Sequence, residues 1–568
     1  SLSLSLSLSL SLSLPLLPYP HLICLVTHLS MALIDLTLLF LAFSFFCFGQ
    51  RYHTWAHTPT YRGFDHYLGY YNADISNTLT RDKQCWQVVL DITLPPPVKV
   101  THLQIDIHGE AKQDTEFERL LRTLPLNVGD VLHHGRYEEI KSKLNSLALE
   151  RGYFDAELSH HEMRVDPATH SAEIRMQLDS GPRYRFGALE LDEPRLQRSF
   201  LHRLVDLEPG IPYDARQLIR LDRSLSDVGY FQRVEIRPHI DRVENNAVPI
   251  TITLEPRPRH AWQAGIGFAT DTGPRLTFGY SNRLINPRGH RFDSELRLSP
   301  VETGLTANYI IPGSEPLKET FDIGTSLLHE DTDTSTSDSI RLITRQTLRH
   351  EFWTETRFIE LLQERSTIGA DRTTSTLLMP GISWNRTQSD NPLRTRRGYR
   401  VGLELRGAWE GLLSDATLMQ IRANARGIHR FGDAGRVTAR TELGTTLGDD
   451  FFDLPASLRF FAGGDNSVRG YAYKSLGPKD SLGDVTGGRH LFTASLEYEH
   501  PLPGEDWWLA AFVDAGNAFN TREAEVEHSY GFGVRWYSPF GRLRLDIAFP
   551  SDTSDDSWRL HFGFGADL

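Results

Sequence analysis

The chain has 568 residues, 40% of them hydrophobic, and a formal net charge of −13 at pH 7. This acidic balance argues against a nucleic-acid-binding protein, which normally carries a basic surface. Beyond residue 50 no apolar run reaches the roughly 20 residues that a spanning helix needs, which argues against a helical membrane protein. The length predicts two or more domains.

Residues 1–50 are expected to be a low-complexity segment and a leader that the mature protein lacks. Residues 1–14 are a strict Ser-Leu repeat. Such alternation suits a strand, but the sequence nearby offers no partner for one. We therefore interpret the repeat as low complexity or mistaken upstream translation, with Met31 as the expected start. The mostly apolar stretch at 33–48 is typical of a signal-peptide core.

Two segments of the first half share one pattern. In each, a helical stretch ends at Gly-Tyr-Phe and two extended stretches follow. The first helical stretch runs from Tyr137 to the tripeptide at 152–154, and the second runs from Tyr213 to the tripeptide at 229–231. Glycine is a frequent helix C-cap because it adopts the left-handed conformation without strain. The repetition predicts tandem α+β modules.

We place these modules at residues 98–181 and 182–257. A third cap, Gly-Tyr-Tyr at 69–71, predicts a shortened module over residues 51–97. The tripeptide itself is best explained as a helix stop beside a core aromatic residue. The repeat therefore predicts architecture rather than chemistry.

From residue 258 to residue 568 the chain reads as short strands in which apolar and polar residues alternate. In one of them, apolar Phe492, Ala494, Leu496 and Tyr498 alternate with polar Thr493, Ser495, Glu497 and Glu499. A period of two gives each strand one apolar and one charged face. A soluble barrel or sandwich would turn the apolar face inward, whereas a membrane barrel turns it toward lipid around a wet lumen. Periodicity alone does not separate these two architectures.

Three features favour the membrane barrel. The final strand, 558–568, keeps its large apolar residues on one face up to the chain end. Long polar loops, such as 331–339, alternate with tight turns, such as 286–289. The span also has room for roughly 14–18 strands, each with about 10 residues in the membrane. Closure into a barrel would remove the exposed edges that an open sheet of this size must protect.

One motif carries a resemblance to a known family. Residues 460–471 read Phe-Phe-Ala-Gly-Gly-Asp-Asn-Ser-Val-Arg-Gly-Tyr. They resemble the lumen-loop motif of the POTRA-barrel superfamily, which contains the BamA insertases and the two-partner-secretion transporters. The stretch 512–516 resembles its aromatic-x-Asp-x-Gly strand, and 531–546 resembles its penultimate-strand block. The matching loop residues are Gly463, Gly464, Ser467, Val468, Arg469, Gly470 and Tyr471.

Within this superfamily the chain most resembles the TamA family, the outer-membrane subunit of the translocation and assembly module. The resemblance extends from about Gly69 to Leu568. It implies periplasmic POTRA modules, then an all-β transmembrane antiparallel barrel of about 16 strands in the bacterial outer membrane. It also implies a lumen loop at 460–488 and a weak seam between the first and last strands. Residues 50–68 are too short to complete the first POTRA module, which is therefore expected to be truncated.

The family also implies roles for individual residues. Its loop arginine pairs with a carboxylate of the barrel wall, and Arg469 and Asp514 match these two positions. Asp514 has the opposite strand parity to Val513, so it is expected to point into the lumen. Glu497 is a second wall carboxylate and an alternative partner. A guanidinium can donate two parallel hydrogen bonds to a carboxylate, which makes this pairing specific.

The last strand is expected to carry a second function. In the family, an aromatic-rich terminal strand is the signal that the insertion machinery reads, and Phe562, Phe564 and Leu568 occupy those positions here. The chain ends on Leu568 instead of the more usual aromatic residue. If the seam opens, the first strand, around 265–270, would pair with a client strand by β-augmentation.

The resemblance implies an outer-membrane factor that helps insert or secrete autotransporter-type β-barrel proteins. Its implied partners are the lipid bilayer, unfolded client proteins and a TamB-like partner anchored in the inner membrane, with no nucleic acid. A passive pore, or a lipid-transport subunit acting with a periplasm-spanning partner, remains an alternative. We expect no enzyme, cofactor or metal, because G-x-S-x-G, H-E-x-x-H, P-loop and C-x-x-C motifs are missing.

Overall fold

The computed structural model describes most of the chain, in two compact units. One unit comprises Ser1–Glu190, Glu208–Ile219 and Arg237–Thr251, and the other comprises Leu191–Leu207, Arg220–Ile236 and Ile252–Leu568. The described residues are 6–13, 67–71, 74–81, 85–193, 195–369, 371–391, 394–432, 435–448, 451–504, 506–521, 525–538, 541–551 and 558–565. No helix within these ranges is long and apolar enough to cross a membrane.

The first sheet has three strands in the order β1-β3-β2 and includes the Ser-Leu repeat. Its strands are β1 (Leu6–Ser13), β2 (Asp74–Arg81) and β3 (Cys85–Thr93). Strand β1 pairs antiparallel with β3, so the repeat has a partner, although one that is distant in the sequence. Strand pairing uses backbone groups, and an edge strand accepts a partner that is distant in sequence. A removable leader at 1–50 and a truncated module at 51–97 stay predictions.

The second sheet belongs to an α+β module. Its strands, in the order β4-β6-β5, combine a parallel β4–β6 pair with an antiparallel β5–β6 pair. Buried apolar side chains of α4, among them Ile140 and Leu144, share one core with Ile174 and Met176 of β6. The elements are β4 (Lys99–His108), η3 (Glu110–Gln113), α3 (Thr115–Arg122), α4 (His134–Arg151), β5 (Glu157–Asp166) and β6 (Ser171–Asp179).

The end of α4 follows the Gly-Tyr-Phe pattern. Gly152 is the C-cap, with a left-handed φ of 83°, and its amide donates to the carbonyl oxygens of Ala148 and Leu149. Tyr153, the next residue, is buried in the core of the module. The tripeptide thus ends the helix and anchors the chain that leaves it.

A third sheet has the order β7-β9-β8. Its elements are β7 (Arg185–Asp192), α5 (Arg198–Leu204), α6 (Ala215–Asp227), β8 (Phe231–Pro238), η4 (Ile240–Arg242) and β9 (Ala247–Pro256). In the second unit, the Tyr230 hydroxyl donates to the Gly289 carbonyl oxygen over 2.5 Å. The Arg203 guanidinium donates to the Gly313 carbonyl oxygen over 2.7 Å. Within that unit, these bonds join α5 and the residue before β8 to two turns of the large sheet.

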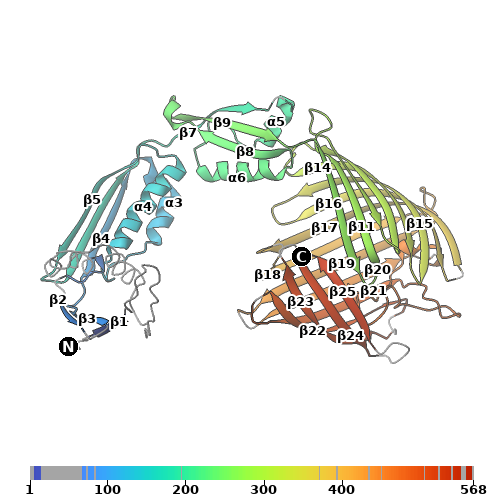
Figure 1. The fold of residues 1–568 in the computed structure, drawn as a ribbon. Coiled ribbons are helices and arrows are strands. Elements are labelled where there is room, and N and C mark those ends of the chain that lie inside the picture. The colour runs from blue at the N-terminus through green and yellow to red at the C-terminus, as the bar shows by residue number, and fades with distance from the viewer. Residues whose placement is uncertain are drawn as a thin grey trace, which may run out of the picture. The chain divides into compact units, whose positions relative to one another are not determined.

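The large sheet has 16 strands in sequence order, β10 to β25, and every neighbouring pair is antiparallel (Figure 1). The predicted number of strands is therefore confirmed. The strands are β10 (His260–Ala269), β11 (Gly273–Asn282), β12 (Arg291–Leu298), β13 (Glu302–Pro312), β14 (Glu319–Asp331), β15 (Ser335–Arg349), β16 (Thr354–Ile368), β17 (Asp371–Ser389), β18 (Arg397–Ala408), β19 (Leu418–Arg430), β20 (Arg436–Leu447), β21 (His490–Pro501), β22 (Trp507–Phe519), β23 (Glu527–Ser538), β24 (Gly541–Pro550) and β25 (Arg559–Gly565).

The two faces of this sheet differ as the alternation predicts. On β22, Leu509 and Val513 are 48% and 55% exposed, whereas Phe512 and Asp514 are buried. Neighbouring strands repeat the pattern, with Leu496 exposed beside buried Glu497. The apolar residues therefore cover the outside of the barrel and the charged residues line its interior, which is the arrangement of a membrane barrel.

The barrel is nearly closed at the junction of β10 and β25, the two ends of the sheet. No strand pairing joins residues 260–269 to residues 559–565. The two strands nevertheless touch, because the rings of Phe268 and Phe562 lie 5.8 Å apart, centroid to centroid. The Phe562 amide donates to the Thr270 hydroxyl oxygen over 3.1 Å. We call this junction the seam.

We predict that Gly152→Ala destabilises the α+β module more than Gly129→Ala does. Both glycines have a positive φ, so each substitution should cost about 1–2 kcal/mol. A Cβ at Gly152 would also lie 2.6 Å from the Cβ of Tyr213, whereas nothing lies within 4 Å of a Cβ at Gly129. Hydrogen exchange of the α4 amides in the full chain measures the difference, and equal protection in both variants would contradict it.

Candidate functional site in the lumen loop

The connection between β20 and β21 contains the sequence motif and folds into the barrel interior. It includes two short 3-10 helices, η5 (Phe451–Asp453) and η6 (Ala456–Leu458). Its apolar anchor is a buried cluster in which loop residues pack against β21 and β22: Phe460, Ala462, Val468, Leu476, Leu491 and Ala518. Val468 is fully buried. The middle residue of the Ser-Val-Arg sequence thus fixes the loop to the wall.

A tight turn precedes the motif arginine. Gly463 and Gly464 have φ values of 99° and 105°, a region that side chains other than glycine rarely adopt. The Ser467 hydroxyl accepts from the Gly463 amide over 3.1 Å, and the Gly464 amide donates to the Val468 carbonyl oxygen over 3.2 Å. This turn directs the next side chain, Arg469, toward the wall.

Arg469 forms a two-pronged contact with Asp514 of β22. Its Nε donates to one carboxylate oxygen over 2.7 Å and a terminal nitrogen donates to the other over 2.9 Å. The Arg469 backbone amide also donates to Asp514, over 3.1 Å. Only 1% of Arg469 and 2% of Asp514 is exposed, so this pair lies away from solvent. Such geometry suits guanidinium and not ammonium groups.

The remaining guanidinium nitrogen of Arg469 contacts two further carboxylates. It donates to Glu497 of β21 over 2.7 Å and to Asp546 of β24 over 3.0 Å. Burial alone would lower the pKa of Arg469, but the Asp514 hydrogen bond and the three nearby carboxylates raise it above its ordinary value. The loop arginine therefore stays charged and joins three wall strands.

Wall arginines continue this ionic network. Arg535 of β23 donates to Glu497 over 2.8 Å and also pairs with Asp546. Arg542 of β24 donates to Glu497 over 2.6 Å. Burying a carboxylate is costly unless its oxygens accept hydrogen bonds, and here arginine side chains lie beside each carboxylate of the network. The network thus depends on all of its members at once.

The guanidinium of Arg469 also packs against an aromatic ring. The Arg469 guanidinium lies 3.4 Å from the ring centroid of Phe512, the aromatic residue of the aromatic-x-Asp-x-Gly strand. The ring fits because its cross-strand partner is Gly531. A Cβ at Gly531 would lie 2.4 Å from the Phe512 ring. The cation–π contact therefore links Phe512 to the arginine that binds Asp514 of the same strand, and Gly531 on β23 leaves room for the ring.

The remaining motif residues contact the last strands. Tyr471 donates from its hydroxyl to Glu527 of β23 over 3.0 Å. Gly470, with a φ of 95°, donates its amide to His561 Nε2 on β25 over 2.8 Å. Of the predicted terminal-strand residues, Phe562 lies at the seam and Phe564 is half exposed. The predicted role of Leu568 lies outside the described residues.

Several members of the site were not predicted from the sequence: Asp271, Asp465, Arg535, Arg542, Asp546 and His561. Strand parity contained part of the signal. Asp546 and His561 each alternate with outward apolar residues, as Asp514 does, and therefore face the lumen. Asp465 lies inside the motif, between Gly464 and Ser467, but no spacing rule connects it to the first and last strands.

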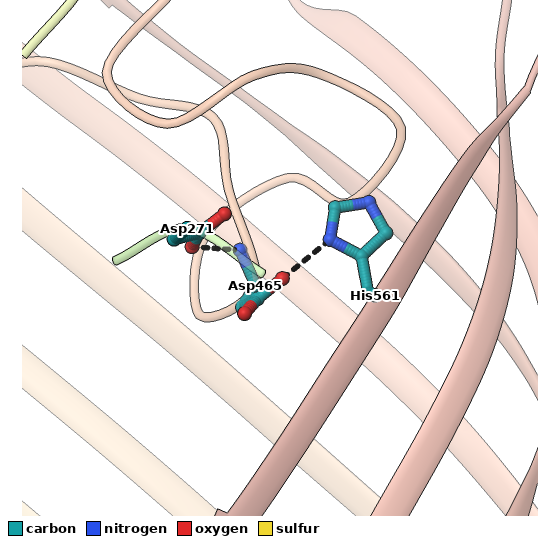
Figure 2. Close-up of side chains that lie close together, drawn as sticks. All are labelled: Asp271, Asp465 and His561. Atoms are coloured by element: carbon teal, nitrogen blue, oxygen red, sulfur yellow. Dashed lines mark hydrogen bonds and ion pairs between the residues drawn. The ribbon is translucent and has the colours of Figure 1, made fainter. Parts of the chain in front are cut away.

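Within the described ranges, one group combines the ligand types of a metal site: Asp271, Asp465 and His561 (Figure 2). The hydrogen bonds of the imidazole argue against coordination. Because the Gly470 amide donates to Nε2, that nitrogen is an acceptor and the ring proton is on Nδ1. Nδ1 lies 2.5 Å from an Asp465 oxygen and donates to it. A cation would need the Nδ1 lone pair, so the geometry favours a hydrogen-bonded cluster.

Two family models match the chain. The model described as Omp85 superfamily domain matches residues 252–567, and the POTRA model, described as surface antigen variable number repeat, matches residues 100–181. The first covers more than half of the chain and includes the whole barrel. The second coincides with the module that contains β4 to β6.

Individual relatives and a solved structure agree with these families. Outer membrane protein assembly factor BamA of Neisseria meningitidis is 21% identical over 84% of this chain and 80% of that protein. BamA of Nitratidesulfovibrio vulgaris is 34% identical, but over 22% of this chain and 17% of that protein. The crystal structure of Haemophilus ducreyi BamA lacking POTRA domains 1–3 matches with a TM-score of 0.67 and 17% identity, over 82% of this chain and 99% of that one. The structural match supports the fold.

We predict that Gly531→Ala destabilises the barrel by about 1–3 kcal/mol, because the added methyl group would lie 2.3 Å from the Ile547 carbonyl oxygen and would also displace Phe512 from its place against Arg469. Gly427→Ala is the matched control, since Gly427 is also a barrel-strand glycine and a Cβ there meets nothing within 4 Å. It should be neutral or slightly stabilising. Urea unfolding followed by tryptophan fluorescence compares the two variants, and equal midpoints would refute the packing argument.

Proposed function

The chain belongs to the Omp85 superfamily, and from that premise we propose that it helps insert or secrete other β-barrel proteins at the bacterial outer membrane. The relatives named outer membrane protein assembly factor support assembly as the activity. The exposed apolar outer face of the barrel supports a location in the bilayer. The α+β modules then face the periplasm.

One observation carries this proposal: β10 and β25 touch without pairing. The edge of a sheet presents unpaired backbone donors and acceptors, which bind an added strand readily. We assign the seam as the place where a client strand pairs with β10. An unfolded client then replaces its backbone hydrogen bonds to water by backbone hydrogen bonds to β10.

The lumen loop serves this function by stabilising the wall beside the seam. Arg469 joins β21, β22 and β24, the strands that lead toward the last strand. Removing one member of a buried ionic network leaves uncompensated charges, so the wall keeps its shape only while the loop is in place. This rigid wall would hold β25 in position while β10 binds a client.

The periplasmic modules supply client and partner binding in this proposal. Strand β5 is one of the two edge strands of its sheet and has 10 residues, enough to pair with an extended peptide. The identity of the clients as autotransporter-type proteins, and of the partner as a TamB-like protein anchored in the inner membrane, rests on the resemblance to the TamA family. A passive pore fits less well, because the buried network attaches the loop within the lumen.

We predict that Arg469→Ala and Asp514→Ala reduce client assembly by similar factors, of at least about tenfold, because either change leaves buried charge unpaired. The double variant should be little worse than either single variant, since both remove the same contact. Assembly of an autotransporter barrel into liposomes that contain the purified protein measures the effect.

Lys479→Ala is the control, because Lys479 is an exposed residue of the same loop. Its assembly rate should equal that of the unmodified protein. Full activity of both Arg469→Ala and Asp514→Ala in well-folded barrels would show that the site is assigned wrongly.

A further inference from the structure

A single loop residue, Asp465, contacts both edges of the barrel (Figure 2). On the first edge, the Thr270 hydroxyl donates to the two Asp465 carboxylate oxygens over 2.8 and 3.0 Å. The Asp465 amide donates to a carboxylate oxygen of Asp271 over 2.6 Å. Thr270 and Asp271 form the turn that connects β10 to β11. The loop is therefore bonded directly to the first hairpin.

The last strand is held by the same loop. His561 of β25 donates from Nδ1 to Asp465 over 2.5 Å, and its Nε2 accepts from the Gly470 amide over 2.8 Å. The imidazole thus lies between two loop groups that are five residues apart in the motif. Asp465 is 3% exposed and His561 is 2% exposed, so water does not compete for these bonds.

The edges depend on these bonds because no strand pairing joins residues 260–269 to 559–565. The direct polar bond between the edges, from the Phe562 amide to the Thr270 hydroxyl, uses the same hydroxyl that donates to Asp465. If Asp465 left, the hydroxyl and the imidazole would each lose a charged, buried acceptor. Among the described contacts, the edges would then keep the bond from the Phe562 amide to the Thr270 hydroxyl and the contact of two phenylalanine rings.

We propose that Asp465 is a positioning residue that fastens both edge strands to the lumen loop, so that the seam opens only when the loop releases them. This inference rests on the proposed function, in which the seam receives clients, and adds a means of control. Arg469 fixes the loop to the wall, and Asp465 bonds the loop, held in that position, to both sides of the seam. A loop displaced from the wall would release β10 and β25 together.

The neighbouring carboxylate makes the fastening sensitive to pH. Asp271 faces Asp465, His561, Arg544 and Tyr473, and burial together with the Asp465 charge raises its pKa to about 6. The pKa of Asp271 is raised in the state in which Asp465 binds both edge strands, so protonation of Asp271 favours that state. The repulsion between the carboxylates of Asp271 and Asp465 is absent below the ordinary carboxyl pKa near 4, because Asp271 is then protonated. It is complete above a pH of about 6.

Hydrogen exchange of the full chain in lipid nanodiscs, read by mass spectrometry for β10 and β25, tests the proposal. Asp465→Ala should raise exchange in both strands by at least about tenfold, the effect of one lost 1.4 kcal/mol interaction. Exchange in Asp465→Asn should lie between that of Asp465→Ala and that of the unmodified protein, because the asparagine amide oxygen remains an acceptor but is uncharged. Combining Asp465→Ala with His561→Ala should add less than the sum of the single effects.

Asp480→Ala is the matched control. Asp480 belongs to the same loop, and its carboxylate accepts from the amides of Leu482 and Asp484 instead of from the edge strands. Exchange of β10 and β25 should not change in this variant. Asp271→Asn supplies the pH readout: after correction for intrinsic exchange, acidification from pH 7.5 to pH 5 should tighten the unmodified seam more than the Asp271→Asn seam.

Unchanged exchange at both edges in Asp465→Ala would overturn the proposal. If Asp465→Ala raises hydrogen exchange in all strands, the Asp465→Asn variant is compared instead. An increase in exchange at β10 and β25 that is no larger than the increase in β15 to β17 would then overturn the proposal. Client assembly is measured separately in the same variants. Faster edge exchange without any change in assembly would support the fastening role and count against the proposed function.

Discussion

The barrel interior is organised around one buried cation, the guanidinium of Arg469. Three carboxylates from different strands share it, and the Phe512 ring packs against its face. Burying so much charge is tolerable only when every group meets its partner, so the loop has one favourable position against the wall. The tight glycine turn, the buried Val468 and the small residue at Gly531 all follow from that requirement, since each makes room for the arginine or directs it.

The same requirement connects the wall to the edges of the barrel. Residues on either side of Val468 reach different parts of the barrel: Arg469 reaches β21, β22 and β24, while Asp465 reaches the first hairpin and β25. The sheet therefore closes through side chains of a loop in place of a final ladder of backbone bonds. A closure of this kind is more easily reversed than a ladder, because a few hydrogen bonds replace a whole row.

The sequence predicted what depends on local pattern. Alternation on β22 places Asp514 inside, the structure puts Arg469 against it, and the Gly-Tyr-Phe repeat locates the helix end at Gly152. What depends on closure was not predictable. Asp465 and His561 are 96 positions apart and meet only because the two ends of the sheet come together. The pairing of the Ser-Leu repeat with β3 was missed for a related reason, since strand edges select partners by geometry and not by sequence distance.

The position of the loop in the chain constrains how this molecule matures. Arg469 precedes the strands whose carboxylates it contacts, β21, β22 and β24. Those strands bring inward-facing acids such as Glu497 and Asp546, which pair with Arg469 as well as with arginines of the wall. A strand added after the loop therefore finds its cationic partner already present in the chain, so its inward-facing acid need not be buried without one.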